Sequence, residues 1–139
     1  MAFIHGRSGV FKLDNNAGSL QTLSAYVDNI DAPFVLETHE TTVFGKTSKT
    51  YIVGLKDFTF SVGGPWDVVM DNHMNEVLYG ANFATSKSFE IHTGATAGTD
   101  VKFTGECFPT SYSGAIPVGD KVSYTADFQG TDTITRTAL

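Results

Sequence analysis

The chain has 139 residues, which predicts a single domain over residues 1–139 with one hydrophobic core. Its net charge of −6 argues against a general nucleic-acid binder, which needs Lys and Arg to displace counterions from phosphate. A single cysteine, Cys107, excludes an internal disulfide framework and a cysteine-rich zinc site. The charged fraction of 17% is low, which fits equally a surface covered by partners and a β surface rich in Ser and Thr.

The N-terminal part of the chain predicts strands separated by turns. Residues 9–13 are expected to form a short strand, and residues 14–18, which include two Asn, a turn. Residues 19–27 are expected to form a long strand. Residues 28–33 should bend the chain, because the proline at their end cannot donate to a β-ladder.

The next segment predicts two strands joined by a basic loop. Residues 34–44 and 50–53 are rich in β-branched and aromatic side chains, and residues 45–49 form a small polar connection. This connection carries two lysines and no acid, although the chain as a whole is acidic. A basic arm on an acidic β-domain suggests contact with another copy of the chain. The candidate subunit contacts are Thr42, Phe44, Gly45, Lys46, Thr47, Ser48, Lys49 and Thr50.

The middle of the chain predicts a half-buried strand followed by a helix. Phe58, Phe60 and Val62 alternate with polar residues, which is the period of a strand with one buried face. Apolar residues then recur at helical spacing across residues 67–79, and Gly80 follows where a helix should end. No other helix is predicted.

The C-terminal part predicts further strands. Residues 88–92, 101–105 and 122–129 are expected to be strands, residues 93–99 a loop, and residues 130–139 a last strand or arm. Strands on both sides of a single helix predict a mainly β fold. We expect a β-sandwich or partly closed barrel with the helix against one side.

No catalytic, cofactor or metal site is predicted. His73 and Glu76 are three residues apart on the helix, but no third metal ligand is indicated, and both are expected to be solvated. The glycine-rich residues 94–99 lack the Lys-Ser/Thr of a phosphate-binding loop. Cys107 lacks the basic surroundings of a reactive thiolate and is expected to be buried on a strand.

Residues 40–57 carry a pattern of an acid, Thr-Thr, Phe-Gly, a small polar loop and then Gly-Leu-x-Asp. Its residues are Glu40, Thr41, Thr42, Phe44, Gly45, Gly54, Leu55 and Asp57. This pattern resembles that of the major tail tube proteins of long-tailed bacteriophages. Residues 23–27 and 30–34 fit the first long strand of the family and its continuation, and residues 63–66 fit the turn before its helix. The resemblance is clearest over residues 19–80.

The resemblance implies a tail-tube-like domain and a structural role. Six copies would form a ring, and stacked rings would form the hollow tube of the virion tail, assembled in the host cytoplasm. The loop at residues 45–50 would reach an adjacent ring. DNA would pass through the lumen without specific binding, and a tape-measure protein and tail terminator and tip proteins would be further partners. No enzymatic activity, cofactor or membrane contact is implied.

Two alternatives stay open from the sequence. The chain could be a soluble β-sandwich binding module or another virion or secretion component, and a protein that stays monomeric would favour this reading. It could also be a small enzyme on a barrel scaffold, which a deep pocket with convergent polar groups would favour.

Overall fold

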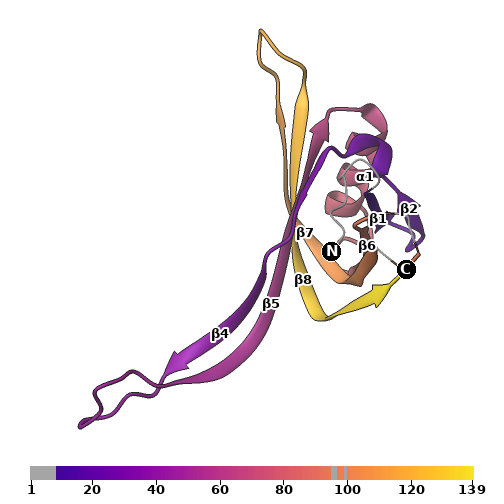
Figure 1. Ribbon diagram of the computed structural model, residues 1–139. Helices are drawn as coiled ribbons and strands as arrows, with labels where there is room; N and C mark the ends of the chain where they lie inside the picture. The colour runs from indigo at the N-terminus through magenta and orange to yellow at the C-terminus, as the bar shows by residue number, and fades with distance from the viewer. Residues whose placement is uncertain (1–8, 95–96, 99) are drawn as a thin grey trace.

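The computed structural model describes residues 9–94, 97–98 and 100–139 (Figure 1). Within these residues the chain forms strands, one α-helix and one 3-10 helix, so the expected mainly β fold with one α-helix is confirmed. In chain order the elements are β1 (Val10–Asp14), β2 (Leu20–Thr22), η2 (Ser24–Tyr26), β3 (Asn29–Asp31), β4 (Phe34–Glu40), β5 (Tyr51–Pro65), α1 (Val68–Tyr79), β6 (Lys87–His92), β7 (Val101–Ala115) and β8 (Ser123–Ala138).

The strands form one antiparallel sheet that curls without closing. Their order is β2-β1-β6-β7-β8-β5-β3, and β4 pairs with β5 outside this path. The curl brings together strands that are four places apart, because the ring of Phe11 on β1 lies 6.0 Å from the ring of Phe60 on β5. The end strands β2 and β3 do not pair with each other, so the sheet stays open rather than forming a barrel.

Phenylalanine rings fill the interior of the curled sheet. The ring of Phe60 lies 4.6 Å from that of Phe128 on β8 and 4.7 Å from that of Phe89 on β6. Phe11 and Phe58 extend the same cluster. Aromatic rings pack well at these separations and cover large areas of a pleated surface. The inward alternation predicted for this part of β5 is therefore confirmed.

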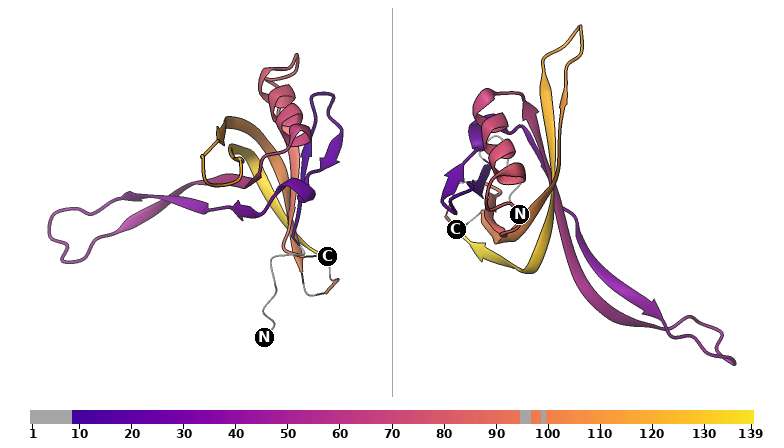
Figure 2. Two further views of the ribbon diagram at one scale, coloured as in Figure 1. Left: turned by 90° about the horizontal axis from the view of Figure 1, so that it is seen from above. Right: turned by 180° about the vertical axis from the view of Figure 1, so that it is seen from behind.

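Helix α1 begins and ends close to where its sequence predicts. The carboxylate of Asp67 accepts a hydrogen bond from the backbone N–H of Val69 at 2.8 Å, which caps the first turn. Met70, Met74 and Val77 are buried among the core residues. The helix therefore packs on the concave side of the sheet (Figure 2).

The long strand predicted at residues 19–27 is wrong. The chain forms the short strand β2 and then η2. The pairing of this segment with β1 ends here, because the Ser24 hydroxyl takes the place of a backbone carbonyl and accepts a hydrogen bond from the N–H of Phe11 at 3.0 Å. The bend predicted at residues 28–33 is also wrong in its centre, where β3 pairs Ile30 with Val62 of β5.

Two strand ends also differ from the prediction because long-range pairing extends the strands. The turn expected at residues 63–66 is wrong, since β5 runs on to Pro65 and pairs there with Ser123 of β8. β7 continues past the predicted residues 101–105 to Ala115, with a register shift between Pro109 and Ser111. A bulge at this point accommodates a proline within a paired strand. The C-terminal tail is the continuation of β8.

His73 is buried, contrary to the solvated position predicted for it, whereas Glu76 is exposed as expected. The Nε2 atom of His73 is buried and has no hydrogen-bond partner among the described residues. Burial lowers the pKa of His73 below 6.5, and its hydrogen bond to the backbone of Asp14 and the charges of Glu76 and Asp14 oppose this shift only in part. The neutral imidazole is therefore the form that the fold accommodates.

Acidification is expected to destabilise the protein through His73. Because its pKa is lower in the folded chain, the unfolded chain binds the proton first, and stability present above about pH 6.5 is lost as the pH falls toward the folded-state pKa. Burial also lowers the pKa of His92, which adds a contribution of the same sign. We expect His73→Gln to flatten the decline of the melting temperature between about pH 7 and pH 5. The exposed His39→Gln is the control, and equal slopes for wild type and His73→Gln would contradict the prediction.

Candidate assembly surface

β4 and the first half of β5 form an arm that projects from the body of the protein (Figure 1). Their register runs from Phe34 opposite Phe58 to Glu40 opposite Tyr51. β5 pairs with β8 only from Thr59 onward, and β4 pairs only with β5 among the described strands. Both edges of the arm therefore carry unpaired backbone groups, which is a template for pairing with another chain. A two-stranded hairpin of this kind is only marginally stable by itself.

The end of the arm is a threonine-lined turn. β4 ends at Glu40, so the strand predicted up to residue 44 is four residues too long. Beyond it, the N–H of Thr41 donates to the carbonyl of Thr50 at 2.8 Å, and the N–H of Thr50 donates to the Thr42 hydroxyl at 3.0 Å. Gly45 has a φ of +87°, a left-handed conformation that glycine adopts without strain. Side-chain hydrogen bonds thus replace the regular ladder at this end.

The eight candidate contact residues all lie in this turn, and all of them are exposed. Lys49 pairs with Glu40 of its own hairpin, with Nζ and Oε1 at 3.8 Å, and both side chains are at least half exposed. Such a pair contributes little to stability. Phe44, which was expected to end the preceding strand, lies in the turn instead, and its side chain is fully exposed. Contact of these residues with another subunit remains a prediction.

The two strands of the arm expose apolar side chains on both faces, which the sequence reasoning did not recognise. The signal was present, because Ile52 and Val53 are adjacent in a strand and must point to opposite faces. Apolar residues on both faces are typical of a strand that is covered on both sides. The exposed apolar residues of the arm are Phe34, Val35, Leu36, Val43, Phe44, Tyr51, Ile52, Val53 and Leu55.

The total exposed area supports the same conclusion. The chain exposes 8981 Å². A compact monomer of 15.0 kDa exposes roughly 7000 Å², so this chain exposes roughly 2000 Å² more. An excess of this size is larger than the roughly 800 Å² that one partner contributes to a standard interface. The exposed apolar residues of the arm contribute to this excess.

The described residues outside the arm include one buried thiol and one further cavity. Among the described residues, no group of three or more His, Cys, Asp or Glu could hold a metal ion. Cys107 is fully buried on β7, as predicted, and burial raises the pKa of its thiol.

A cavity of about 460 Å³ opens where the sheet fails to close, and its walls include the apolar Phe11, Ile30, Phe34 and Phe103. No helix in the described part of the chain is long and apolar enough to cross a membrane.

Solved structures of tail components share this architecture. No protein-family model matches the sequence, and no curated protein matches it. A chain in the tail of an empty gene transfer agent particle, computed with C6 symmetry, is 18% identical with a TM-score of 0.76, over 98% of this chain and 100% of that one. A chain in the virion of the native particle is 17% identical with a TM-score of 0.76, over the same shares.

The tail tube of SPP1 is similar as well. It is 10% identical with a TM-score of 0.71, over 98% of this chain and 80% of the SPP1 chain. None of these three structures is described as an enzyme. The shared region includes nearly all of this chain and is not restricted to the resemblance at residues 19–80. The chain therefore has the tail tube fold, and the resemblance to tail tube proteins is confirmed at the level of the fold.

Proposed function

We propose that this chain is a structural subunit of a virion tail tube, in which six copies form a ring and the rings stack. The observation that carries the proposal is the arm, whose two faces are apolar and whose two edges are unpaired. A neighbouring copy would cover the faces and pair with the edges. Contacts between unlike surfaces of identical subunits close into rings or continue as filaments, and a stacked-ring tube uses both.

The ring number and the role of the arm tip are part of this proposal. The C6 symmetry of the gene transfer agent tail supports six copies per ring. The tip at residues 42–50 would contact an adjacent ring, where Lys46 and Lys49 would meet acidic side chains. The chain has 15 acidic residues against nine Lys and Arg, so acids are the more abundant partner on a second copy.

The lumen of such a tube would serve as the conduit for DNA ejection. Six copies carry a net charge of −36 per ring (6 × −6). This field repels a sliding polyanion, whereas a basic lumen would retain it by counterion release. In this proposal a tape-measure protein occupies the lumen during assembly in the host cytoplasm, and terminator and tip proteins close the two ends.

Purified protein is expected to assemble into tubes, and salt is expected to promote the assembly. Like-charged subunits repel one another, and ions screen exposed charges beyond about 10 Å at 0.1 M. Light scattering at fixed protein concentration should rise with NaCl, and negative-stain microscopy should show hollow tubes. A protein that stays strictly monomeric from low to high salt would instead identify a soluble β-sandwich binding module.

A further inference from the structure

The turn between β7 and β8 is a second projecting feature, and its apolar tip is uncovered. The last paired residues of the hairpin are Ala115 and Ser123. Beyond them Ile116 is 82% exposed and Val118 is fully exposed. Exposed side chains of this kind, at the end of a hairpin, have no role in the core of their own chain.

The hairpin holds this tip in a defined direction. β7 and β8 pair without a further register shift from Ser111 opposite Asp127 to Ala115 opposite Ser123, just before the turn. The exposed Lys121 lies 3.6 Å from Asp28, between Nζ and Oδ2. The tip and the arm project from opposite ends of the same layer of long strands (Figures 1 and 2). The two features are therefore placed to meet when copies are stacked along the strand direction.

A notch with a partly apolar lining lies at the base of the arm. β8 leaves β5 after Gln129, and Asp132 takes a left-handed φ of +63° where the strand turns away. The separation leaves a cavity of about 650 Å³ between the arm and the middle of β8. The residues that line it include the apolar Val35, Leu36, Leu55 and Ile134.

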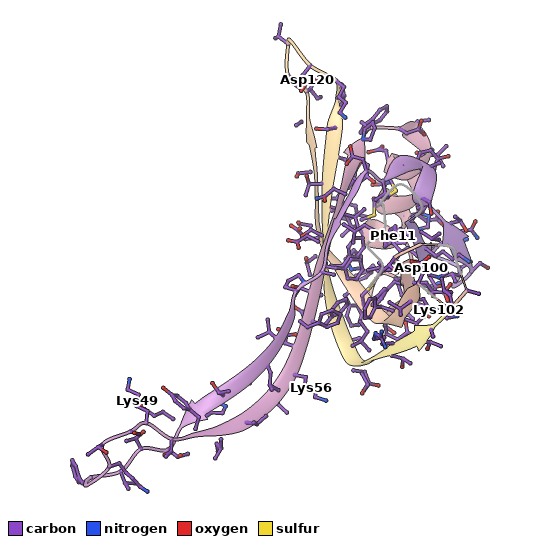
Figure 3. The ribbon with its side chains drawn as sticks, viewed as in Figure 1. Phe11, Lys49, Lys56, Asp100, Lys102 and Asp120 are labelled. Atoms are coloured by element: carbon purple, nitrogen blue, oxygen red, sulfur yellow. The ribbon has the colours of Figure 1, made fainter. Side chains whose placement is uncertain are left out.

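The notch carries charges of both signs. Lys56, Asp57 and Asp132 all line it, and Lys56 forms no ion pair within the described part of the chain. Asp120 is exposed beside the apolar tip, and Lys56 and Asp120 are marked in Figure 3. The fit of the tip therefore depends on apolar contact and on the placement of the two features.

We propose that the β7–β8 tip of one copy inserts into the notch of the copy above it in the next ring. This inference rests on the proposed tube and names the surface that joins its rings. Ile116 and Val118 would fill the notch. The contact is heterologous, since each copy presents one tip and one notch, and it therefore propagates along the tube axis.

The pairing also limits the spacing of the rings. Val118 and Gly130, which borders the notch, are twelve residues apart (130 − 118), and at about 3.3 Å per residue they are separated by at most roughly 40 Å. The axial repeat of the tube should not exceed this value. A longer repeat in microscope images would overturn the pairing, because the tip would not reach the next notch.

Val118→Asp tests the contact by placing a carboxylate where the apolar notch should receive a valine. The side chain is fully exposed in the monomer, so the melting temperature should be unchanged. The protein concentration needed for tube formation should rise about tenfold or more. Val68→Asp is the matched control at an exposed position on α1, and it should assemble normally. If wild type forms no tubes, the proposed function fails; if Val118→Asp assembles like wild type, only the tip–notch contact fails.

Cross-linking identifies the partner directly. Tubes of a Val118→Cys/Leu55→Cys variant would be treated with a short bis-maleimide and then denatured in excess N-ethylmaleimide. The native Cys107 is buried and should not react in the folded chain. The inference predicts a ladder of products that continues beyond six copies, and no such ladder from either single variant. A ladder that stops at six would place the contact within a ring, and the absence of cross-linked species in tubes would also overturn the inference.

Discussion

Replacing Phe60 by alanine is expected to lower the free energy of unfolding by about 3–5 kcal/mol. Phe60 is 1% exposed, and its ring packs against rings from β1, β6 and β8. These strands are fixed by their own ladders, so the surrounding rings cannot collapse into the space left behind. Urea unfolding followed by circular dichroism would measure the loss.

Phe44→Ala is the matched control for this prediction. It removes the same atoms from a ring that is fully exposed at the tip of the arm. Exposed substitutions usually change stability by no more than about 0.5 kcal/mol. Equal losses for the two variants would show that the aromatic cluster is not the principal core of the fold.

The Lys46→Glu/Lys49→Glu double variant is expected to fold normally and to fail in tube growth. Both lysines are exposed, and the pair between Lys49 and Glu40 lies in solvent, so the melting temperature of the monomer should barely change. In the proposed tube the reversed charges would face acids of an adjacent ring, where like charges oppose association. Thermal melting and electron microscopy would be carried out on the same preparation.

Two controls separate charge from other effects of these substitutions. Lys46→Arg/Lys49→Arg keeps both positive charges and should form tubes. The defect of the glutamate variant should shrink as NaCl is raised, because salt screens exposed charges. Normal tubes from the glutamate variant, or unfolding of its monomer, would show that the tip does not have the assigned role.

Local patterns were sufficient for some elements of this fold. The helical spacing of Met70, Met74 and Val77 and the glycine at position 80 predicted α1 within one residue, because both signals act within a few turns of chain. The alternation of Phe58 and Phe60 likewise predicted which face of β5 is buried. The resemblance at residues 19–80 predicted the fold that the solved structures share.

Elements that depend on distant partners were predicted less well. β7 and β8 extend each other far beyond the stretches whose composition favours strand, since each supplies the hydrogen-bond partners of the other. β5 continues to Pro65 for the same reason. Ser24 ends a predicted strand because its hydroxyl bonds to Phe11, thirteen residues away. None of these contacts leaves a periodic signal in the local sequence.

The candidate assembly surface likewise has features that the sequence alone predicts and features that depend on the tertiary structure. The sequence by itself determined that the loop at residues 45–49 is small and basic, and that Ile52 and Val53 place apolar side chains on both faces of a strand. Only the tertiary structure decided that these faces are exposed, because β8 turns away from β5 after Gln129 and leaves the arm without a covering layer. Whether a side chain is buried depends on where strands distant in the sequence pack. An apolar pattern therefore predicts that a surface is buried, but it does not predict whether the same chain or another subunit buries it.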